Sequence, residues 1–226
     1  HRRPVRLASQ HDCNLRCAYC FYLEKASLYP GSAHPRMSDA VLERLIASYM
    51  ATDQPQYLFG WQGGEPTLMG LPFFQRAIAL QRRYGRPGAV VANGLQTNGT
   101  LLDAPLAAFL AEHRFLVGVS LDGPAALHDP NRATAGGGPT HARVLAGIDT
   151  LGRNRVEFNI LTLVNRLNGN HPETIYRDLV ARGFRYHQYI PCVEFDAQGR
   201  LLPVSVSARQ WGDFLCALFD RWYAAD

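Results

Sequence analysis

The stretch that decides the fold is Cys13-Asn14-Leu15-Arg16-Cys17-Ala18-Tyr19-Cys20, in which three cysteines follow the spacing C-x3-C-x2-C. One short loop of this kind can deliver three thiolates to a single [4Fe–4S] cluster. Since such a cluster has four irons, three protein ligands leave one iron without a protein donor. An open coordination position is where a metal site does chemistry, as the contrast between closed and open zinc sites shows. The motif therefore predicts a cluster that binds a small chelating molecule and passes it an electron.

A zinc site and a plain electron carrier are the alternatives to this interpretation. Zinc sites usually repeat a cysteine pair or add closely spaced histidines to reach four donors. The remaining cysteines, Cys192 and Cys216, lie far along the chain, and His11 is so close to Cys13 that the two make a strained chelate. A ferredoxin-like carrier brings a fourth cysteine. The spacing favours the open cluster, and a non-catalytic iron–sulfur or zinc-binding module stays as the alternative from another class.

Composition limits the remaining possibilities. With 226 residues, 47% of them hydrophobic, the chain can bury one sizeable core. The net charge of +4 comes from 23 basic and 19 acidic residues without a block of one sign, so no nucleic-acid surface is predicted. No apolar run approaches the ~20 residues of a membrane span, and no signal-peptide pattern opens the chain. Five cysteines, three of them clustered, do not resemble a disulfide framework, and free thiolates suit the reducing cytoplasm.

Apolar, β-rich runs alternate with helical patterns along the chain. We predict strands over residues 5–8, 57–61, 90–95, 115–121, 156–164 and 184–190. Helices are expected from residues 38, 72, 103, 140 and 172 onward, with a last one over 208–225. Six β/α units in order indicate a parallel sheet with helices outside it. Because a closed β/α barrel has eight such units, we expect an α/β fold of the open, partial (β/α)6 barrel type.

The unusual polar residues all follow the carboxyl ends of these strands, where β/α barrels place their reactive groups. The cysteine loop follows the first strand, and Gln62-Gly63-Gly64-Glu65-Pro66 follows the second. The runs 96–99 and 120–124 follow the third and fourth strands. Random turn residues would populate the opposite ends as well, so this placement predicts a single site.

The chain resembles radical S-adenosylmethionine (SAM) enzymes, and among them most closely the anaerobic sulfatase-maturating enzymes. The cysteine motif is specific to the superfamily; the subgroup is indicated by residues 9–22, 59–68, 95–101, 115–124 with His128, and 156–161. The resemblance implies that the fold is the radical SAM type of partial barrel. It also implies that SAM is cleaved reductively to a 5′-deoxyadenosyl radical, which takes a hydrogen from a Cys or Ser of a sulfatase peptide to give formylglycine. The implied cofactors are a [4Fe–4S] cluster and SAM; the implied partners are a sulfatase peptide or protein and an electron donor such as flavodoxin or ferredoxin.

By the same resemblance, Cys13, Cys17 and Cys20 are cluster ligands, and SAM is contacted by Gln62, by the turn Gly63, Gly64, Glu65 and Pro66, by Ser120 and by Val193. The residues themselves support several of these roles. Two glycines let the backbone approach a ligand, and Glu65 can balance the amino group of SAM, although an ordinary turn explains the run too. Ser120 suits a ribose hydroxyl unless it bonds only to nearby backbone. Tyr22 can flank an adenine or be a buried aromatic.

Other polar residues carry weaker expectations. Asp122-Gly123-Pro124 has the composition of a turn. Arg132 and Arg143 are candidates for carboxylate or ribose contacts. No residue stands out as a catalytic base.

The sequence departs from the family at its C-terminal end. The family carries a cysteine-rich region there, with two auxiliary clusters and a carboxylate that acts as base, and this chain ends at Asp226 before it. We therefore expect a radical SAM core over residues 1–205, and over 206–226 the start of a helix leading to that region. Without it the complete reaction is not expected. Cys192 and Cys216 are expected to be small buried residues. A radical SAM maturase making a thioether or carbon–carbon cross-link is the second hypothesis.

Overall fold

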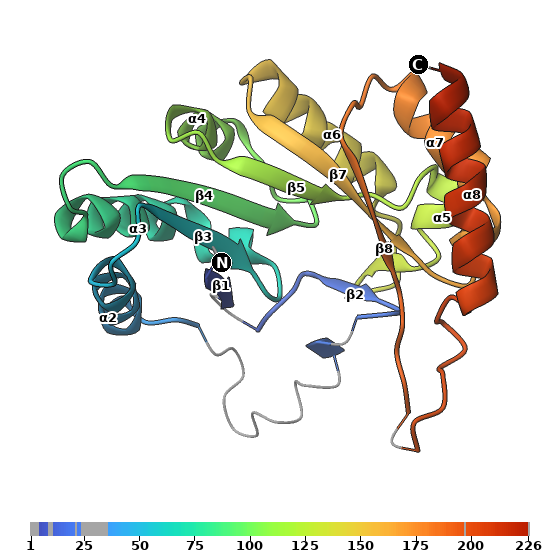
Figure 1. The fold of residues 1–226 in the computed structure, drawn as a ribbon, viewed down its shortest axis with the longest axis horizontal. Coiled ribbons are helices and arrows are strands. Elements are labelled where there is room, and N and C mark those ends of the chain that lie inside the picture. Colours follow the sequence, from blue (N-terminus) through green and yellow to red (C-terminus); the bar gives the residue numbers. More distant parts are fainter. Residues whose placement is uncertain (1–4, 9–10, 21, 24–35, 197, 226) are drawn as a thin grey trace.

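A six-stranded parallel sheet organises the protein, whose computed structural model describes residues 5–8, 11–20, 22–23, 36–196 and 198–225 (Figure 1). The strands are β1 (Val5–Ala8), β3 (Gln56–Gln62), β4 (Val90–Thr97), β5 (Leu116–Ser120), β7 (Glu157–Val164) and β8 (His187–Pro191). Each pairs in parallel with the next one in chain order. Since β1 and β8 do not pair, the sheet is open, which confirms the predicted partial barrel.

Helices connect the strands and lie around the outer side of the sheet (Figure 1). They are α2 (Asp39–Met50), η2 (Pro66–Met69), α3 (Gly70–Tyr84), α4 (Ala104–Glu112), α5 (Ala125–His128), α6 (His141–Arg153), η3 (Asn168–Asn170), α7 (Pro172–Ala181) and α8 (Ala208–Ala225). Local chemistry explains their starts. At α4, for example, the Asp103 carboxylate accepts a hydrogen bond from Leu106 N at 2.9 Å, and Pro105 occupies the first turn.

The hydrophobic core lies between the sheet and these helices. Along β3 buried and half-buried residues alternate, because successive side chains of a strand point to opposite faces. Tyr57, Phe59 and Trp61 are the buried set, and Trp61 packs edge-on against Phe74 of α3 with ring centroids 6.1 Å apart. The alternation turns Gln62, the last residue of the strand, to the opposite face from Trp61.

A second, two-stranded sheet was not predicted. It consists of β2 (Leu15–Cys17), inside the cysteine loop, and β6 (Arg132–Thr134), and the two strands are antiparallel. Three-residue strands are too short to show an alternating pattern, and their pairing satisfies backbone groups that the loop would otherwise leave open. The ribbon ties the cysteine loop to the segment that follows β5.

The C-terminal helix matches its predicted range and packs on the core through its first half. Phe214 is fully buried, and Val206, just before the helix, is 3% exposed. Cys216 is exposed, so the expectation that it is buried was wrong. The reason is helical geometry, since a residue two positions after Phe214 points to a different side of the helix. Cys192 is buried as expected.

Two smaller differences concern element boundaries. Strand β8 begins at His187 instead of residue 184, because Phe184 N still bonds to Leu179 O at the end of α7. Helix α3 begins at Gly70, ahead of Pro72. Among the described residues, no helix combines the length and apolar character that crossing a bilayer requires.

Candidate cluster site at the carboxyl edge of the sheet

The three motif cysteines lie together at the carboxyl edge of the sheet. Cys17 is 8% exposed, and Cys13 and Cys20 are half-buried. All three belong to one side-chain cluster that also contains Leu15, Tyr19, Leu163, Cys192 and Val204. Cys192 is thus a fourth thiol nearby, delivered by the segment after β8.

Burial dominates the chemistry of the thiols. It raises the pKa of Cys13 to about 12 and also raises the pKa of Cys17. Because metal ligands must be thiolates, loading this site releases protons. Within the described part of the chain, no three His, Cys, Asp or Glu side chains are arranged to hold one metal ion.

Glu65 holds two of the loops at this edge together. Its side chain is 1% exposed, and Oε1 accepts hydrogen bonds from the hydroxyls of Thr67 and Thr97 at 2.6 and 2.7 Å. Oε2 accepts from Asn98 N at 2.7 Å, and Thr67 N bonds to Oε1 at 3.0 Å. Burial nevertheless raises the pKa of Glu65. These four donors show a carboxylate that fixes the turn and the neighbouring loop, a role the sequence did not reveal.

Gly64 is where the turn meets the cysteine loop. Its φ is +46°, and a Cβ built there would lie 2.2 Å from the carbonyl oxygen of Asp12. The next residue, Glu65, donates its backbone N–H to that same oxygen at 2.7 Å. The sequence suggested that glycine allows a ligand to approach the backbone; the approach seen in the structure is that of Asp12.

The loop after β4 makes a second attachment to the cysteine loop. Asn98 Nδ2 lies 3.7 Å from Cys13 Sγ and donates to Asn14 Oδ1 at 2.9 Å. Asn14 in turn donates to Thr100 Oγ1 at 2.8 Å. Asn98, from the run 96–99 that follows β4, therefore lies against the cysteine loop.

A third contact to the cysteine loop is made by buried polar side chains around Asp122. The sequence indicated only a turn at Asp122, whereas the structure shows a buried hydrogen-bond acceptor. Asp122 is fully buried, and its carboxylate accepts hydrogen bonds from the Tyr19 hydroxyl, from Arg132 Nε at 3.0 Å and from Leu163 N at 3.0 Å. Tyr19 lies between two of the ligand cysteines, Cys17 and Cys20. No local sequence pattern predicts this contact, because Tyr19 and Asp122 are 103 residues apart.

His128 supports the same region as a neutral imidazole. Its Nδ1 accepts from Asp122 N at 3.2 Å, which leaves the proton on Nε2, 3.1 Å from Thr140 Oγ1. Burial lowers the pKa of His128 to about 4. The Thr140 hydroxyl in turn donates a hydrogen bond to the carbonyl oxygen of Arg132.

The remaining predicted SAM contacts lie along the same edge. Ser120 ends β5 and is 8% exposed, and among the described residues its hydroxyl has no hydrogen-bond partner. Gln62 ends β3 and is half-buried. The ring of Tyr22 lies edge-on to His11, with centroids 6.0 Å apart. Val193 follows Cys192 after β8 and is 47% exposed, so it is the most open member of the set.

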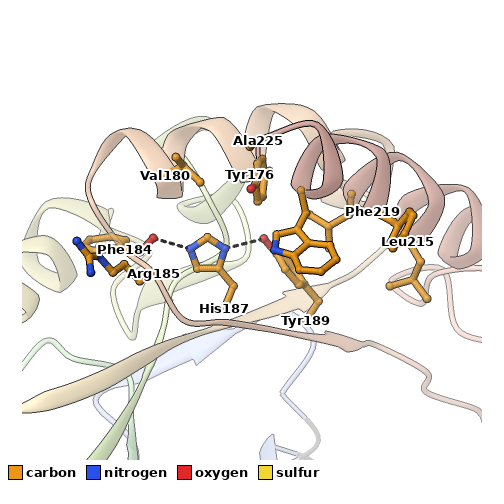
Figure 2. A pocket seen from close by; sticks show the side chains of 11 residues that line it. Tyr176, Val180, Phe184, Arg185, His187, Tyr189, Leu215, Phe219 and Ala225 are labelled. Atoms are coloured by element: carbon orange, nitrogen blue, oxygen red, sulfur yellow. Dashed lines mark hydrogen bonds between the residues drawn. The ribbon is translucent and has the colours of Figure 1, made fainter.

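A separate groove of about 760 Å³ lies between α7, β8 and α8, away from the cysteines (Figure 2). His187 bonds there to the Phe184 carbonyl oxygen at 3.0 Å and to the Tyr189 hydroxyl at 3.3 Å. Trp222 and Phe219 of α8 also line the groove. None of the predicted site residues lines this groove.

Known proteins share this arrangement. The family model of the radical SAM superfamily matches residues 7–179, which include the cysteine loop and most of the sheet. The chain belongs to the radical SAM superfamily.

Its relatives within the superfamily include proteins of the expected subgroup. A serine-type anaerobic sulfatase-maturating enzyme of Bacteroides thetaiotaomicron is 40% identical over 95% of this chain and 55% of its own length. A cysteine-type enzyme of Clostridium perfringens is 37% identical over 93% of this chain and 57% of its own length. The chain therefore spans a little over half the length of these relatives.

Solved structures give the same picture. Native anSMEcpe with bound AdoMet and Cp18Cys peptide has a TM-score of 0.88 and 35% identity, covering 98% of this chain and 60% of that one. Streptococcus suis SuiB bound to the precursor peptide SuiA has a TM-score of 0.68 at 13% identity, covering 97% of this chain and 47% of that one. The SuiB likeness shows the shared radical SAM fold alone.

Proposed function

We propose that this chain is the core of an anaerobic sulfatase-maturating enzyme, a radical SAM oxidoreductase that begins the conversion of a Cys or Ser in a sulfatase peptide to formylglycine. One observation carries the proposal. The three motif thiols gather at the carboxyl edge of a partial barrel whose chain is 40% identical, over 95% of its length, to a serine-type enzyme of this kind. The chain spans a little over half the length of these relatives.

In this proposal Cys13, Cys17 and Cys20 hold a [4Fe–4S] cluster, and SAM binds beside it. When bound, the cluster supplies the electron that breaks the S–C5′ bond of SAM. The donor set fits, since Cys13, Cys17 and Cys20 pack in one side-chain cluster and thiolates are the ligands that hold iron–sulfur clusters. The apolar neighbours Leu15 and Leu163 shield the site from water, which protects a reactive species from side reactions.

The SAM contacts are proposed for the residues along the strand ends. They are Tyr22, Gln62, Gly63, Gly64, Glu65, Pro66, Ser120 and Val193. Two have particular support. The free hydroxyl of Ser120 is available to a ribose, and Glu65, which accepts four hydrogen bonds, fixes the turn beside the cysteine loop. No residue of this chain is assigned as catalytic base.

The partners follow from the relatives and from the chemistry. A peptide of a sulfatase is the proposed substrate, because the structural relative anSMEcpe was solved with a peptide and AdoMet. The target residue is Cys or Ser; relatives of both types match to a similar degree, at 37% and 40% identity. A flavodoxin or ferredoxin is the proposed electron donor, and the reducing cytoplasm the proposed compartment. Residues 206–226 are proposed to lead into a further region that holds auxiliary clusters.

Product analysis tests this function. The protein is incubated anaerobically with SAM, a reductant and peptides that carry Cys, Ser or Ala at the target position. We expect an aldehyde, trapped by a hydrazide and located by mass spectrometry, on the Cys or the Ser peptide and none on the Ala peptide. A product that lacks hydrogens but forms no hydrazone would instead identify a thioether or carbon–carbon cross-linking maturase. If the protein cleaves no SAM at all, the result would support the alternative of a non-catalytic iron–sulfur or zinc-binding module.

A further inference from the structure

A buried ion pair lies next to Cys17, one of the proposed cluster ligands. Asp122 is fully buried and Arg132 is 8% exposed, and Arg132 Nε is 3.0 Å from Asp122 Oδ2. A buried pair of charges is not in itself evidence for stability, because desolvation offsets the attraction. The pair therefore needs an explanation other than stability.

The arginine faces the ligand cysteine. Cys17 of β2 and Arg132 of β6 are cross-strand partners, and both side chains are buried while their neighbour Arg16 is exposed. The Arg132 guanidinium carbon lies 5.3 Å from the centre of the Tyr19 ring, two residues after Cys17.

Asp122 holds the Arg132 side chain in this position through their ion pair. Asp122 receives three donors from three separate elements, namely Tyr19 in the cysteine loop, Arg132 in β6 and Leu163 in β7. Burial raises the pKa of the Cys17 thiol, and against it the positive charge of Arg132 lowers that pKa more than the negative charge of Asp122 raises it. At the ligand sulfur the pair thus acts as a partly compensated positive charge.

We propose that the Asp122–Arg132 pair sets the reduction potential of the cluster that Cys17 ligates. The inference rests on the proposed function, which supplies the cluster. Hydrogen bonds to ligand sulfurs, local charge and solvent exposure are the levers by which proteins adjust iron–sulfur potentials. Arg132 acts through local charge and favours the reduced form, because an added electron is stabilised by a nearby positive charge. Asp122 moderates that effect and fixes its geometry, so both are positioning residues.

The test is a redox titration of the anaerobically reconstituted protein, followed by electron paramagnetic resonance of the reduced cluster. Arg132→Gln removes the positive charge and should lower the potential, whereas Asp122→Asn leaves Arg132 uncompensated and should raise it. A charge a few Å away in a partly buried site changes an equilibrium by about tenfold or more, which corresponds to about 59 mV for one electron. The double variant should return close to the wild-type potential.

Arg16→Gln is the matched control. It removes the same charge next to Cys17, but from the exposed face of β2, where solvent screens it; we expect a shift several times smaller. Arg132→Lys should keep most of the wild-type potential because it keeps the charge. Iron and sulfide content per chain is measured for every variant.

Opposite shifts in the two charge variants, larger than the shift in Arg16→Gln, support the proposal. Shifts of the same sign, or shifts no larger than the control, overturn it. If neither charge variant assembles a cluster although wild type does, the pair only builds the loop and the proposal is wrong. If wild type itself binds no cluster, the proposed function fails first and takes the inference with it.

Discussion

Replacing Gly64 by alanine tests whether the turn after β3 is built to receive the cysteine loop. The added Cβ would lie 2.2 Å from the Asp12 carbonyl oxygen and 2.8 Å from the His11 carbonyl carbon, where at least about 3.0 Å is needed. The loop must therefore move by most of an ångström. That movement would break the hydrogen bond between Glu65 N and Asp12 O, which is 2.7 Å long.

The magnitude has three parts. A left-handed backbone conformation at a residue with a Cβ costs about 1–2 kcal/mol. Forcing an extra methyl group into a packed site costs about 1–3 kcal/mol. Losing a partly buried backbone hydrogen bond costs roughly another 1 kcal/mol. We expect the Gly64→Ala variant to lose about 3–6 kcal/mol of unfolding free energy. It should also hold less iron per chain, because the loop that carries Cys13 is displaced.

Gly88→Ala is the control, since Gly88 also has a positive φ of +81° but an added Cβ meets nothing within 4 Å. It should lose only the conformational part, about 1–2 kcal/mol. Urea unfolding of the two metal-free variants gives the free energies, and iron analysis after anaerobic reconstitution gives the loading. If Gly64→Ala matched Gly88→Ala in stability and wild type in iron content, the packing argument for this turn would be refuted.

Three further predictions concern single side chains. Ser120→Ala should change the unfolding free energy by less than about 0.5 kcal/mol, because the hydroxyl bonds to no described residue. The same variant should weaken SAM binding, measured by calorimetry, about threefold to tenfold. A stability loss with unchanged SAM binding would contradict this. His128 has a pKa of about 4 when folded, so the unfolded chain takes up its proton first as the pH falls, and stability decreases through this residue by about 2 kcal/mol between pH 7 and pH 5. Urea unfolding at the two pH values should show that decrease reduced in His128→Gln; an equal decrease would contradict it. Asp103→Ala should lower stability by about 1 kcal/mol through loss of the α4 cap, whereas Asp103→Asn keeps the capping acceptor and should not, and equal losses in both would argue against capping.

The barrel was predictable from sequence because each of its units is local. A buried parallel strand reads as a short apolar run, and a helix such as α8 reads as a repeat of 3.6 residues, so order and type follow without long-range information. The three cysteines lie within eight residues, and the polar runs follow strands directly. The placement of Gln62, Ser120 and Asn98 at one edge then follows from the parallel sheet.

What sequence could not supply are contacts between distant segments. Tyr19 and Asp122 meet across 103 residues, and the β2–β6 ribbon joins equally remote segments. Asp122 beside Gly123 has the composition of a turn, and only the fold shows that its carboxylate collects three donors. The sequence indicated a role for Glu65 in binding a ligand. It could not show that Glu65 already has four protein donors, because two of them, Thr97 and Asn98, come from the end of the next strand and its loop. Cys216 was misplaced because hydrophobic composition does not determine which side of a helix a single residue occupies.

The central claim is that Cys13, Cys17 and Cys20 hold a cluster with an open iron that cleaves SAM. The most direct measurement is formation of 5′-deoxyadenosine by the anaerobically reconstituted protein with dithionite and SAM, comparing wild type, Cys17→Ala and Cys192→Ala. Cys192 is the matched control, because it is a buried thiol in the same side-chain cluster but lies outside the motif. The account predicts product from wild type and from Cys192→Ala, and none from Cys17→Ala. Product from Cys17→Ala, or a wild-type protein that binds zinc and assembles no cluster, would contradict it.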